Sequence, residues 1–313
     1  MEFLKTISAY FNIIRPKNLL MIALTQGIIY YYLFGGLEVN TALQGIKLYL
    51  FILTTVIIAA GGYIINDIAD FKADMINKPH KTYIPYPITI TNGWIYYKSI
   101  IVIGLLISVY IAYQTQNLPL ITLYPLASIV LYFYSFKYKN SVLTGNIIVS
   151  LFIAFVSGIV IFAERHFLFH SSNGSQSQGV LIILIFFMIF SFLVNLIREI
   201  IKDIEDAEGD KTQGIVTLPI KYGVNRAKNI CIILLVVTIA LLLIWMLTTS
   251  INLDFRVKAY VGLLVVAPLV IIIQILIKST LKKDFQHISS ILKWTMLAGL
   301  GACILMSQTI IHD

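Results

Sequence analysis

The sequence predicts an all-α, polytopic membrane protein with nine transmembrane helices, arranged as two four-helix units around a central cavity plus a ninth helix. Hydrophobic residues make up 58% of the chain and charged residues only 12%, whereas an ordinary soluble domain has about 25% charged residues. An acidic pattern also occurs twice, 136 residues apart, which indicates an internal repeat. We expect a single membrane-embedded domain over residues 1–313, with repeat halves at about 1–140 and 141–280 and a ninth helix at 291–311.

Apolar runs define the expected helices in chain order, because a helix needs about 20 apolar residues to cross a bilayer. Nine runs reach this length or approach it. The expected spans are Leu19–Phe34, Leu48–Ile65, Ile100–Tyr113, Leu118–Tyr134, Val142–Phe162, Val180–Ile197, Ile230–Leu247, Val257–Ile277 and Ile291–Ile311.

The loops between these spans alternate in positive charge. After spans 2, 4, 6 and 8 they hold four, two, six and three Lys or Arg residues, against at most two after each of the others. Positive charge collects on the cytoplasmic side of membrane proteins, so we expect the N-terminus and both Asp-rich loops to be cytoplasmic. The net charge of +8 then follows from topology and requires no nucleic-acid partner. Nine spans would place the two termini on opposite sides.

The polar run Ser171–Gly179 lies near the middle of the chain and predicts a flexible turn on the non-cytoplasmic side. Together with the repeat offset, it favours two units of four helices each. Each acidic stretch then ends the second helix of its unit, so the two stretches can face each other across a central cavity.

The first acidic stretch is Asn66–Asp74, and it directly follows the second apolar run. On a helix, Asp67, Asp70 and Asp74 stand at i, i+3 and i+7, and Asn66 lies four residues before Asp70, so their oxygens converge on one side. Carboxylates this close repel one another unless cations share the site. Oxygen donors without His or Cys suit Mg²⁺ or Ca²⁺ better than zinc.

The second acidic stretch, Ile201–Asp210, matches Ile65–Asp74 at five of ten positions, which include all three Asp residues. The corresponding residues are Asp203, Asp206 and Asp210. The alternative is that each stretch is only a solvated acidic helix end, and two matched copies make this alternative less favourable.

Two carboxylate clusters beside Lys and Arg, next to apolar helices, suit a ligand with a multiply charged phosphate head and a long apolar tail. A prenyl diphosphate has this chemistry. Mg²⁺ between the carboxylates and the diphosphate would neutralise the leaving group, so that the allylic C–O bond ionises without a protein nucleophile. Ring faces such as those of Phe71, Tyr132 and Tyr134 could shield the allylic cation, although ordinary packing or an interfacial belt is the favoured explanation for any single aromatic residue.

These two stretches resemble the Asp-rich motifs of the UbiA-type intramembrane prenyltransferases, and nine spans agree with that family. The resemblance implies Mg²⁺-dependent transfer of a polyprenyl group from its diphosphate to an acceptor. It implies one metal site at Asn66, Asp70 and Asp74, with Asp67 beside it, and a second at Asp206 and Asp210 together with Asp203. Of these residues, Asp70, Asp74, Asp206 and Asp210 are the expected catalytic ones.

The basic loops carry the expected diphosphate contacts. Lys81 stands where the family often has Arg, and the following family Pro is absent, so this loop matches less well. Tyr134 and Lys137 resemble a family element near the diphosphate, and Asn18, which follows Arg15-Pro16, resembles a cavity-facing residue before the first span. For each, an interfacial anchor or a helix cap is the alternative interpretation.

The expected acceptor-binding residues are Arg198, Lys202 and Asn18. The segment around Arg198 and Lys202 resembles most the members that alkylate geranylgeranylglyceryl phosphate, and the two cations would hold the acceptor phosphate. Members that prenylate an aromatic quinone precursor share most of these residues, so that acceptor remains an alternative. A secondary transporter with an internal repeat is the alternative from another class, but its charges would lie within broken spans rather than at span ends. Residues Arg198 and Lys202 could also simply pair with neighbouring Glu residues.

Overall fold

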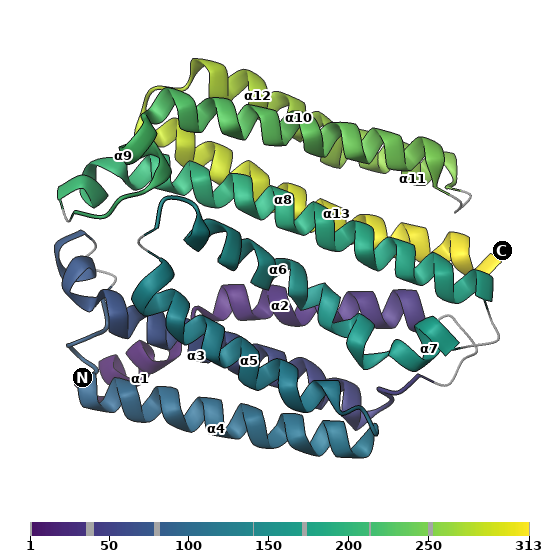
Figure 1. Ribbon diagram of the computed structural model, residues 1–313, viewed down its shortest axis with the longest axis horizontal. Helices are drawn as coiled ribbons and strands as arrows, with labels where there is room; N and C mark the ends of the chain where they lie inside the picture. The colour runs from purple at the N-terminus through teal and green to yellow at the C-terminus, as the bar shows by residue number, and fades with distance from the viewer. Residues whose placement is uncertain are drawn as a thin grey trace. The chain divides into compact units, whose positions relative to one another are not determined.

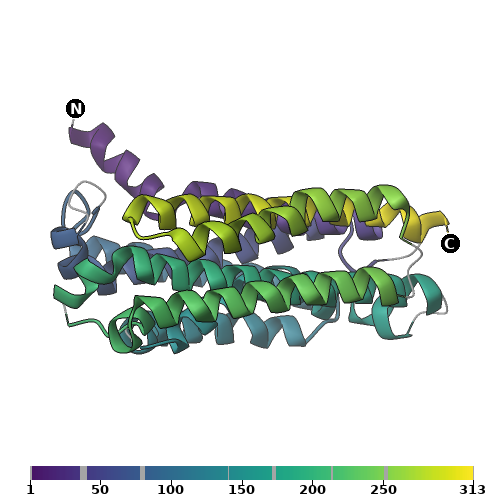
Figure 2. The same cartoon turned by 90° about the horizontal axis from the view of Figure 1, so that it is seen from above.

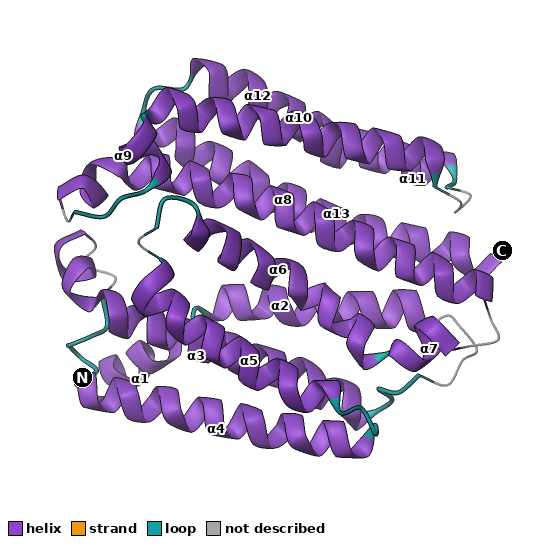
Figure 3. Cartoon of the chain, viewed as in Figure 1, coloured by secondary structure: helices purple, strands orange, loops and turns teal. Residues whose placement is uncertain are grey.

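The computed structural model describes residues 2–35, 41–77, 82–139, 141–170, 174–212, 214–249 and 253–312, and their regular elements are all helical (Figures 1 and 3). The predicted all-α fold class is confirmed. The helices are α1 (Glu2–Ile13), α2 (Pro16–Ile29), η1 (Tyr30–Phe34), α3 (Ile46–Asn77), α4 (Ile90–Gln114), α5 (Pro119–Phe133), η3 (Tyr134–Tyr138), α6 (Thr144–Ala163), α7 (Arg165–His170), α8 (Gly174–Thr212), α9 (Leu218–Tyr222), α10 (Val224–Thr248), α11 (Phe255–Val261), η4 (Gly262–Val266), α12 (Ala267–Lys278) and α13 (Lys282–His312).

Eight helical segments within the described ranges are long and apolar enough to cross a membrane. They are Ile46–Lys72, Ile90–Gln114, Pro119–Tyr138, Thr144–Ala163, Gln176–Thr212, Val224–Thr248, Phe255–Lys278 and Lys282–Ser307. The predicted first span, Leu19–Phe34, falls in α2 and η1 and is not among them. Its polar residues, such as Thr25 and Gln26, and its three consecutive tyrosines make it less apolar than the others. The count of nine is therefore not confirmed.

Close contacts divide the chain into two compact units, Met1–Gly27 with Thr41–Lys139 and Phe162–Glu164, and Ile28–Asn40 with Asn140–Ile161 and Arg165–Asp313. In the first unit, α3 packs against α4 and α5, and α4 against α5 (Figure 1). Gly104 of α4 allows the close approach to α3, since a Cβ atom there would lie 2.9 Å from Ile57 and 3.0 Å from Ile58. The predicted single domain with two repeat halves stays a prediction.

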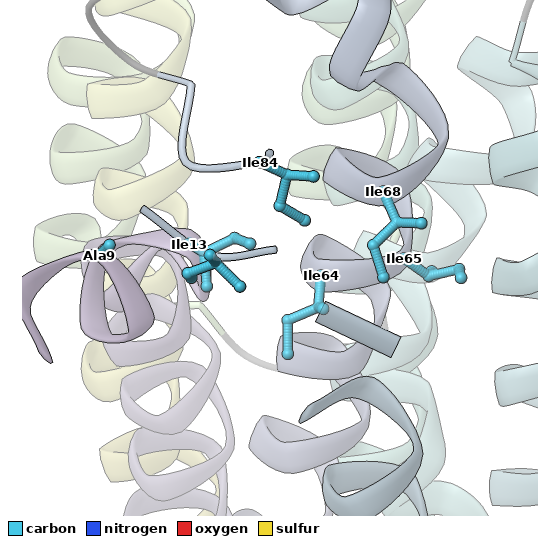
Figure 4. Packing of buried hydrophobic residues seen from close by; sticks show 7 residues of the cluster. Ala9, Ile13, Ile64, Ile65, Ile68 and Ile84 are labelled. Atoms are coloured by element: carbon cyan, nitrogen blue, oxygen red, sulfur yellow. The ribbon is translucent and has the colours of Figure 1, made fainter. Parts of the chain in front are cut away.

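A cluster of aliphatic side chains joins α1 to the acidic end of α3 (Figure 4). Ala9 and Ile13 of α1 pack with Ile64, Ile65 and Ile68 of α3, and all five are at most 4% exposed. Burial of a large aliphatic side chain contributes roughly 1.5–3 kcal/mol, so this cluster fixes α1 beside the first acidic stretch.

A buried carboxylate organises the other end of the first unit. Glu164 is 1% exposed and accepts hydrogen bonds from the backbone N–H groups of Ala42 and Leu43, at 2.8 and 2.9 Å. The Asn117 amide donates to the carbonyl of Phe162 at 2.7 Å in the same region. Three connections of the chain are thus tied together here.

In the second unit, α8 packs against α10 and α13, and α12 packs against both α10 and α13 (Figures 1 and 2). Phe186 of α8 stacks on Trp245 of α10 with ring centroids 4.3 Å apart. Both α3 and α8 continue well beyond their apolar runs, so the acidic stretches form helix ends, as the spacing of their Asp residues predicted.

Three short segments, η1, η3 and η4, have π-helical turns. In η3 the Lys139 N–H donates to the Tyr134 carbonyl at 2.9 Å, a bond across five residues instead of four. Such a turn changes the direction of the side chains that follow it.

Candidate functional site

The first acidic stretch forms the last turns of α3, where Asn66, Asp70 and Asp74 follow one another at intervals of four residues. The Asn66 amide donates to Asp70 Oδ2 at 3.0 Å. Lys139 donates to Asn66 Oδ1 at 3.1 Å and forms an ion pair with Asp70 Oδ2. The Asp70 side chain is only 17% exposed, so water screens this pair weakly. The structure thus places a cation on the predicted carboxylate face, as mutual repulsion requires.

Asp67 has a different cationic partner. Arg15 Nη2 lies 2.7 Å from Asp67 Oδ1, and its guanidinium lies 4.9 Å from the centre of the Tyr63 ring. Arg15 adopts a positive φ of 54° between α1 and α2, a conformation that is uncommon for residues other than glycine. This turn directs the chain from α1 into α2 and brings Arg15 to α3.

The second acidic stretch lies near the end of α8, in the second unit. The Asn146 amide of α6 donates to Asp203 Oδ2 at 2.7 Å. Lys282 of α13 approaches Asp206 Oδ1 at 3.8 Å, and this pair is more exposed, with 62% and 34% of the two side chains accessible. Asp210 follows one turn later and is partly buried. Each stretch therefore combines an Asn amide, carboxylates and a Lys within its own unit.

Arg198 and Lys202, the expected acceptor-binding pair, both contact one carboxylate. Glu199 Oε1 lies 3.0 Å from Arg198 Nη1 and 2.7 Å from Lys202 Nζ. The Nε atom of Arg198 is buried and has no hydrogen-bond partner among the described residues. The pairing with Glu199 matches the alternative interpretation in which neighbouring Glu residues neutralise these cations. It also holds Lys202 directly before Asp203, and Arg198 between one and two turns before Asp203, along α8.

The expected diphosphate contacts have separate locations. Tyr134 and Lys137 lie in η3, and Lys137 is exposed, with its ammonium 5.7 Å from the centre of the Tyr138 ring. Lys81 lies outside the described residues. Asn18, which was expected to bind the acceptor, is in the first turn of α2, half-buried, and its backbone N–H donates to the Arg15 carbonyl at 2.8 Å.

Sequence reasoning did not select three residues that the structure brings to the acidic stretches: Arg15, Lys139 and Asn146. It considered Glu199 only as a pairing partner of Arg198 and Lys202. The sequence contained a signal for two of the three residues, Lys139 and Arg15. Lys139 stands in the same basic turn as Lys137, and Arg15 belongs to the segment from which only Asn18 was chosen. No pattern marked Asn146, because it is a single polar residue near the start of an apolar run.

The donor atoms fit a hard divalent cation. Among the described residues, no three His, Cys, Asp or Glu side chains converge to hold a metal ion on their own. Mg²⁺ typically uses only one or two carboxylates, together with water and substrate phosphate oxygens. The carboxylate oxygens of Asp70 and Asp74 in the first stretch, and of Asp206 and Asp210 in the second, are suitable ligands of this kind.

Long apolar helices, two of which end in cation-paired carboxylates, define an integral, multi-pass membrane protein. The sequence matches the UbiA prenyltransferase family over residues 18–297, so the chain belongs to this family. The protein is therefore a prenyltransferase, and the interpretation as a transporter is set aside.

Similar proteins agree with this assignment. The digeranylgeranylglyceryl phosphate synthase of Methanococcus aeolicus is 32% identical over 221 residues, 70% of each chain. The synthase of the same name from Sulfurisphaera tokodaii is 28% identical over 307 residues, which cover 96% of this chain and 98% of the relative. A solved structure of a digeranylgeranylglyceryl phosphate synthase superimposes with a TM-score of 0.68 at 25% identity and covers 96% of this chain and 99% of its own. A UbiA homologue from Archaeoglobus fulgidus, bound to GPP and Mg²⁺, shares the fold with a TM-score of 0.58 at 16% identity, over 94% of this chain and 99% of its own.

Proposed function

We propose that this enzyme transfers a geranylgeranyl group from its diphosphate to geranylgeranylglyceryl phosphate, in a Mg²⁺-dependent reaction at the cytoplasmic side of the membrane. The observation that carries the proposal is the full-length similarity to a digeranylgeranylglyceryl phosphate synthase, over 96% of this chain. The two acidic helix ends support it, because each supplies carboxylates for a cation-bound diphosphate.

In this proposal, each acidic stretch supplies ligands for Mg²⁺: the oxygens of Asn66, Asp70 and Asp74 in the first stretch, and those of Asp203, Asp206 and Asp210 in the second. When bound, Mg²⁺ would neutralise charge on the leaving diphosphate. Lys139, which already contacts Asp70, can donate to a phosphate oxygen from the same place. The allylic C–O bond then ionises without attack by a protein nucleophile, and aromatic ring faces shield the cation.

Arg198 and Lys202 serve the acceptor phosphate in this proposal. Glu199 keeps both cations in place through its Oε1 atom. The Arg198 guanidinium has a free Nε donor, so it can bond a phosphate oxygen without giving up Glu199. A neutral aromatic acceptor would gain less from these two cations, which is why we favour a phosphate-bearing one.

The test uses purified enzyme in lipid nanodiscs with radiolabelled geranylgeranyl diphosphate and two acceptors, geranylgeranylglyceryl phosphate and an aromatic quinone precursor. We expect a labelled product only with the phosphate-bearing lipid, loss of that product in EDTA and recovery when Mg²⁺ is restored. Product from the aromatic acceptor alone would overturn the acceptor assignment, and full turnover in chelator would overturn the metal dependence.

Variants of the acidic stretches connect the reaction to the proposed residues. Asp70→Asn and Asp206→Asn keep the shape of each side chain but remove its charge, so each should lower turnover by at least about a hundredfold, as loss of a charge-stabilising group does in other enzymes. Asp254→Asn is the matched control, because Asp254 forms only an exposed, 3.9 Å ion pair with Arg256. Near wild-type turnover in either test variant would show that its stretch has a structural role.

A further inference from the structure

Helix α1 has two apolar sides, and the enzyme's reaction accounts for neither. Ala9 and Ile13 face the aliphatic cluster on α3. Leu4, Ile7 and Phe11 are 69%, 50% and 60% exposed. These three stand at i, i+3 and i+7 and form one stripe. Ile7 and Phe11 each lie two residues before a buried residue, and residues two apart in a helix point about 200° from each other. The exposed stripe therefore lies opposite the buried one.

A polar stripe runs between these two sides. Lys5, Ser8 and Asn12 are exposed, and the Asn12 amide donates to Ser8 Oγ at 3.0 Å. Such a helix, with an apolar stripe and a polar stripe that are both exposed, is typical of segments that lie in the membrane interface.

Aromatic residues indicate the depth at which α1 lies. Tyr10 of α1 contacts Tyr96 of α4 edge-on, with ring centroids 5.1 Å apart. On the same end of α4, Trp94 stacks on Phe136 with an angle of 3° between the rings, and Tyr132 packs beside Phe136. Clustered Trp and Tyr side chains at the ends of spans mark the level of the lipid headgroups. Helix α1 is thus attached at the boundary of the bilayer.

The direction of α1 agrees with that position. In Figure 2 the helix runs obliquely to α3 and α4 of its own unit and does not extend either of them. A helix that lies at the level of the headgroups and is oblique to the spans runs along the membrane surface rather than through the bilayer.

We propose that α1 is an interfacial membrane anchor that inserts Leu4, Ile7 and Phe11 into the adjacent lipid leaflet and keeps Lys5, Ser8 and Asn12 in water. Lipid covers the exposed apolar stripe, because the aromatic residues beside α1 lie at the end of α4 and mark the level of the lipid headgroups. The opposite face of α1 packs on Ile64, Ile65 and Ile68 of α3. The position of α1 in the interface therefore determines how far the first acidic stretch lies from the lipid surface.

Spin labels on single introduced cysteines test this proposal in nanodiscs that each hold one copy of the full chain. The native Cys231 and Cys303 are free but buried, so the label reacts at the introduced site. Labels go on the apolar stripe (Leu4→Cys, Ile7→Cys, Phe11→Cys) and on the polar stripe (Lys5→Cys, Ser8→Cys, Asn12→Cys). Val236→Cys, at an exposed apolar position in α10, is the lipid reference, and Arg256→Cys, at an 89% exposed side chain, is the water reference.

The collision rates of each spin label with oxygen and with a water-soluble nickel chelate show whether the label lies in lipid, in water or against protein. We expect the apolar stripe to collide with oxygen and not with nickel, at a depth of about 5–10 Å below the headgroups, while the polar stripe collides with nickel. Equal nickel access to both stripes would overturn the proposal in favour of a helix in water. Protection of the apolar stripe from both reagents would overturn it in favour of a face that is covered by protein.

Discussion

Two lysines of one turn, Lys137 and Lys139, make different contacts although they are only two residues apart. Lys137 lies over the Tyr138 ring and is exposed, whereas Lys139 contacts both Asn66 and Asp70. Residues two apart point in nearly opposite directions on a regular helix, so Lys137 and Lys139 lie on different sides of the segment, and the diphosphate contact expected of Lys137 stays a prediction. The π-helical turn at η3 changes that direction further, and residue composition gives no sign of such a turn.

Paired variants of these lysines would distinguish them by function. Lys139→Met should raise the KM for geranylgeranyl diphosphate about ten- to a hundredfold, because a charge-assisted hydrogen bond contributes about 1.5–3 kcal/mol. Lys137→Met is the matched control and should leave the KM near that of the wild type. Steady-state kinetics with a varied donor provides the measurement, and the reverse order of the two effects would assign the diphosphate contact to Lys137.

The acceptor residues make a separate prediction. Arg198→Ala should weaken use of the phosphate-bearing acceptor by roughly one to two orders of magnitude, because it removes charge-assisted donors to phosphate. The KM for the prenyl diphosphate should barely change. Kinetics with a varied acceptor would measure this, and an increase confined to the donor KM would remove Arg198 from the acceptor site.

At the scale of the element, apolar runs predicted the eight candidate membrane spans of the described residues, but not where these helices end. The predicted span Ile100–Tyr113 is the second half of α4, which begins at Ile90. Thr89 caps that helix by accepting a hydrogen bond from the Asn92 N–H at 3.2 Å, within a polar segment that hydropathy does not assign to a span. Helix ends depend on such local hydrogen bonds, so periodicity of apolar residues does not reveal them.

Glu164 connects elements that hydropathy treats as separate. Glu164→Ala would leave the N–H groups of half-buried Ala42 and buried Leu43 without this acceptor, at a cost of about 1–3 kcal/mol for an unpaired buried group. We therefore expect a fall of several degrees in the melting temperature of the protein in detergent, measured by fluorescence.

Asp254→Ala serves as the comparison for this stability measurement, because exposed ion pairs contribute only about 0–1 kcal/mol. Equal melting temperatures for Glu164→Ala and the wild type would mean that water satisfies the backbone of Ala42 and Leu43. In that case Glu164 would not organise this end of the unit.

At the scale of the whole molecule, the sequence predicted an all-helical membrane enzyme and its two acidic stretches on comparable helices. The family match confirms the class of enzyme. The roles of the individual site residues stay predictions. Contacts such as that between Asn146 and Asp203 join residues 57 positions apart, and a single sequence does not show which distant residues meet.

The membrane topology of the full chain can be tested with reporters fused at its loops. Reporters at the N-terminus, after Lys81 and after Thr217 should read cytoplasmic, because the loops richest in Lys and Arg lie there. Reporters at Ser175 and after Ile311 should read the opposite side. A non-cytoplasmic N-terminus together with a cytoplasmic Lys81 would mean that the α2–η1 segment does not cross, and a cytoplasmic Ser175 would contradict the whole arrangement.

The π-helical turn at Tyr134–Tyr138 affects how this enzyme is aligned with its relatives. A π turn holds about one residue more than an α turn, so it can absorb a one-residue insertion while the helix before it stays intact. A relative with a plain α turn at this point would have one residue fewer. If the alignment gap is then placed in the following loop, Lys139 is matched to the wrong position, and substrate preference is inferred from the wrong side chain. Placing the gap within residues 134–138 keeps the lysines that face the acidic helix end in the same column.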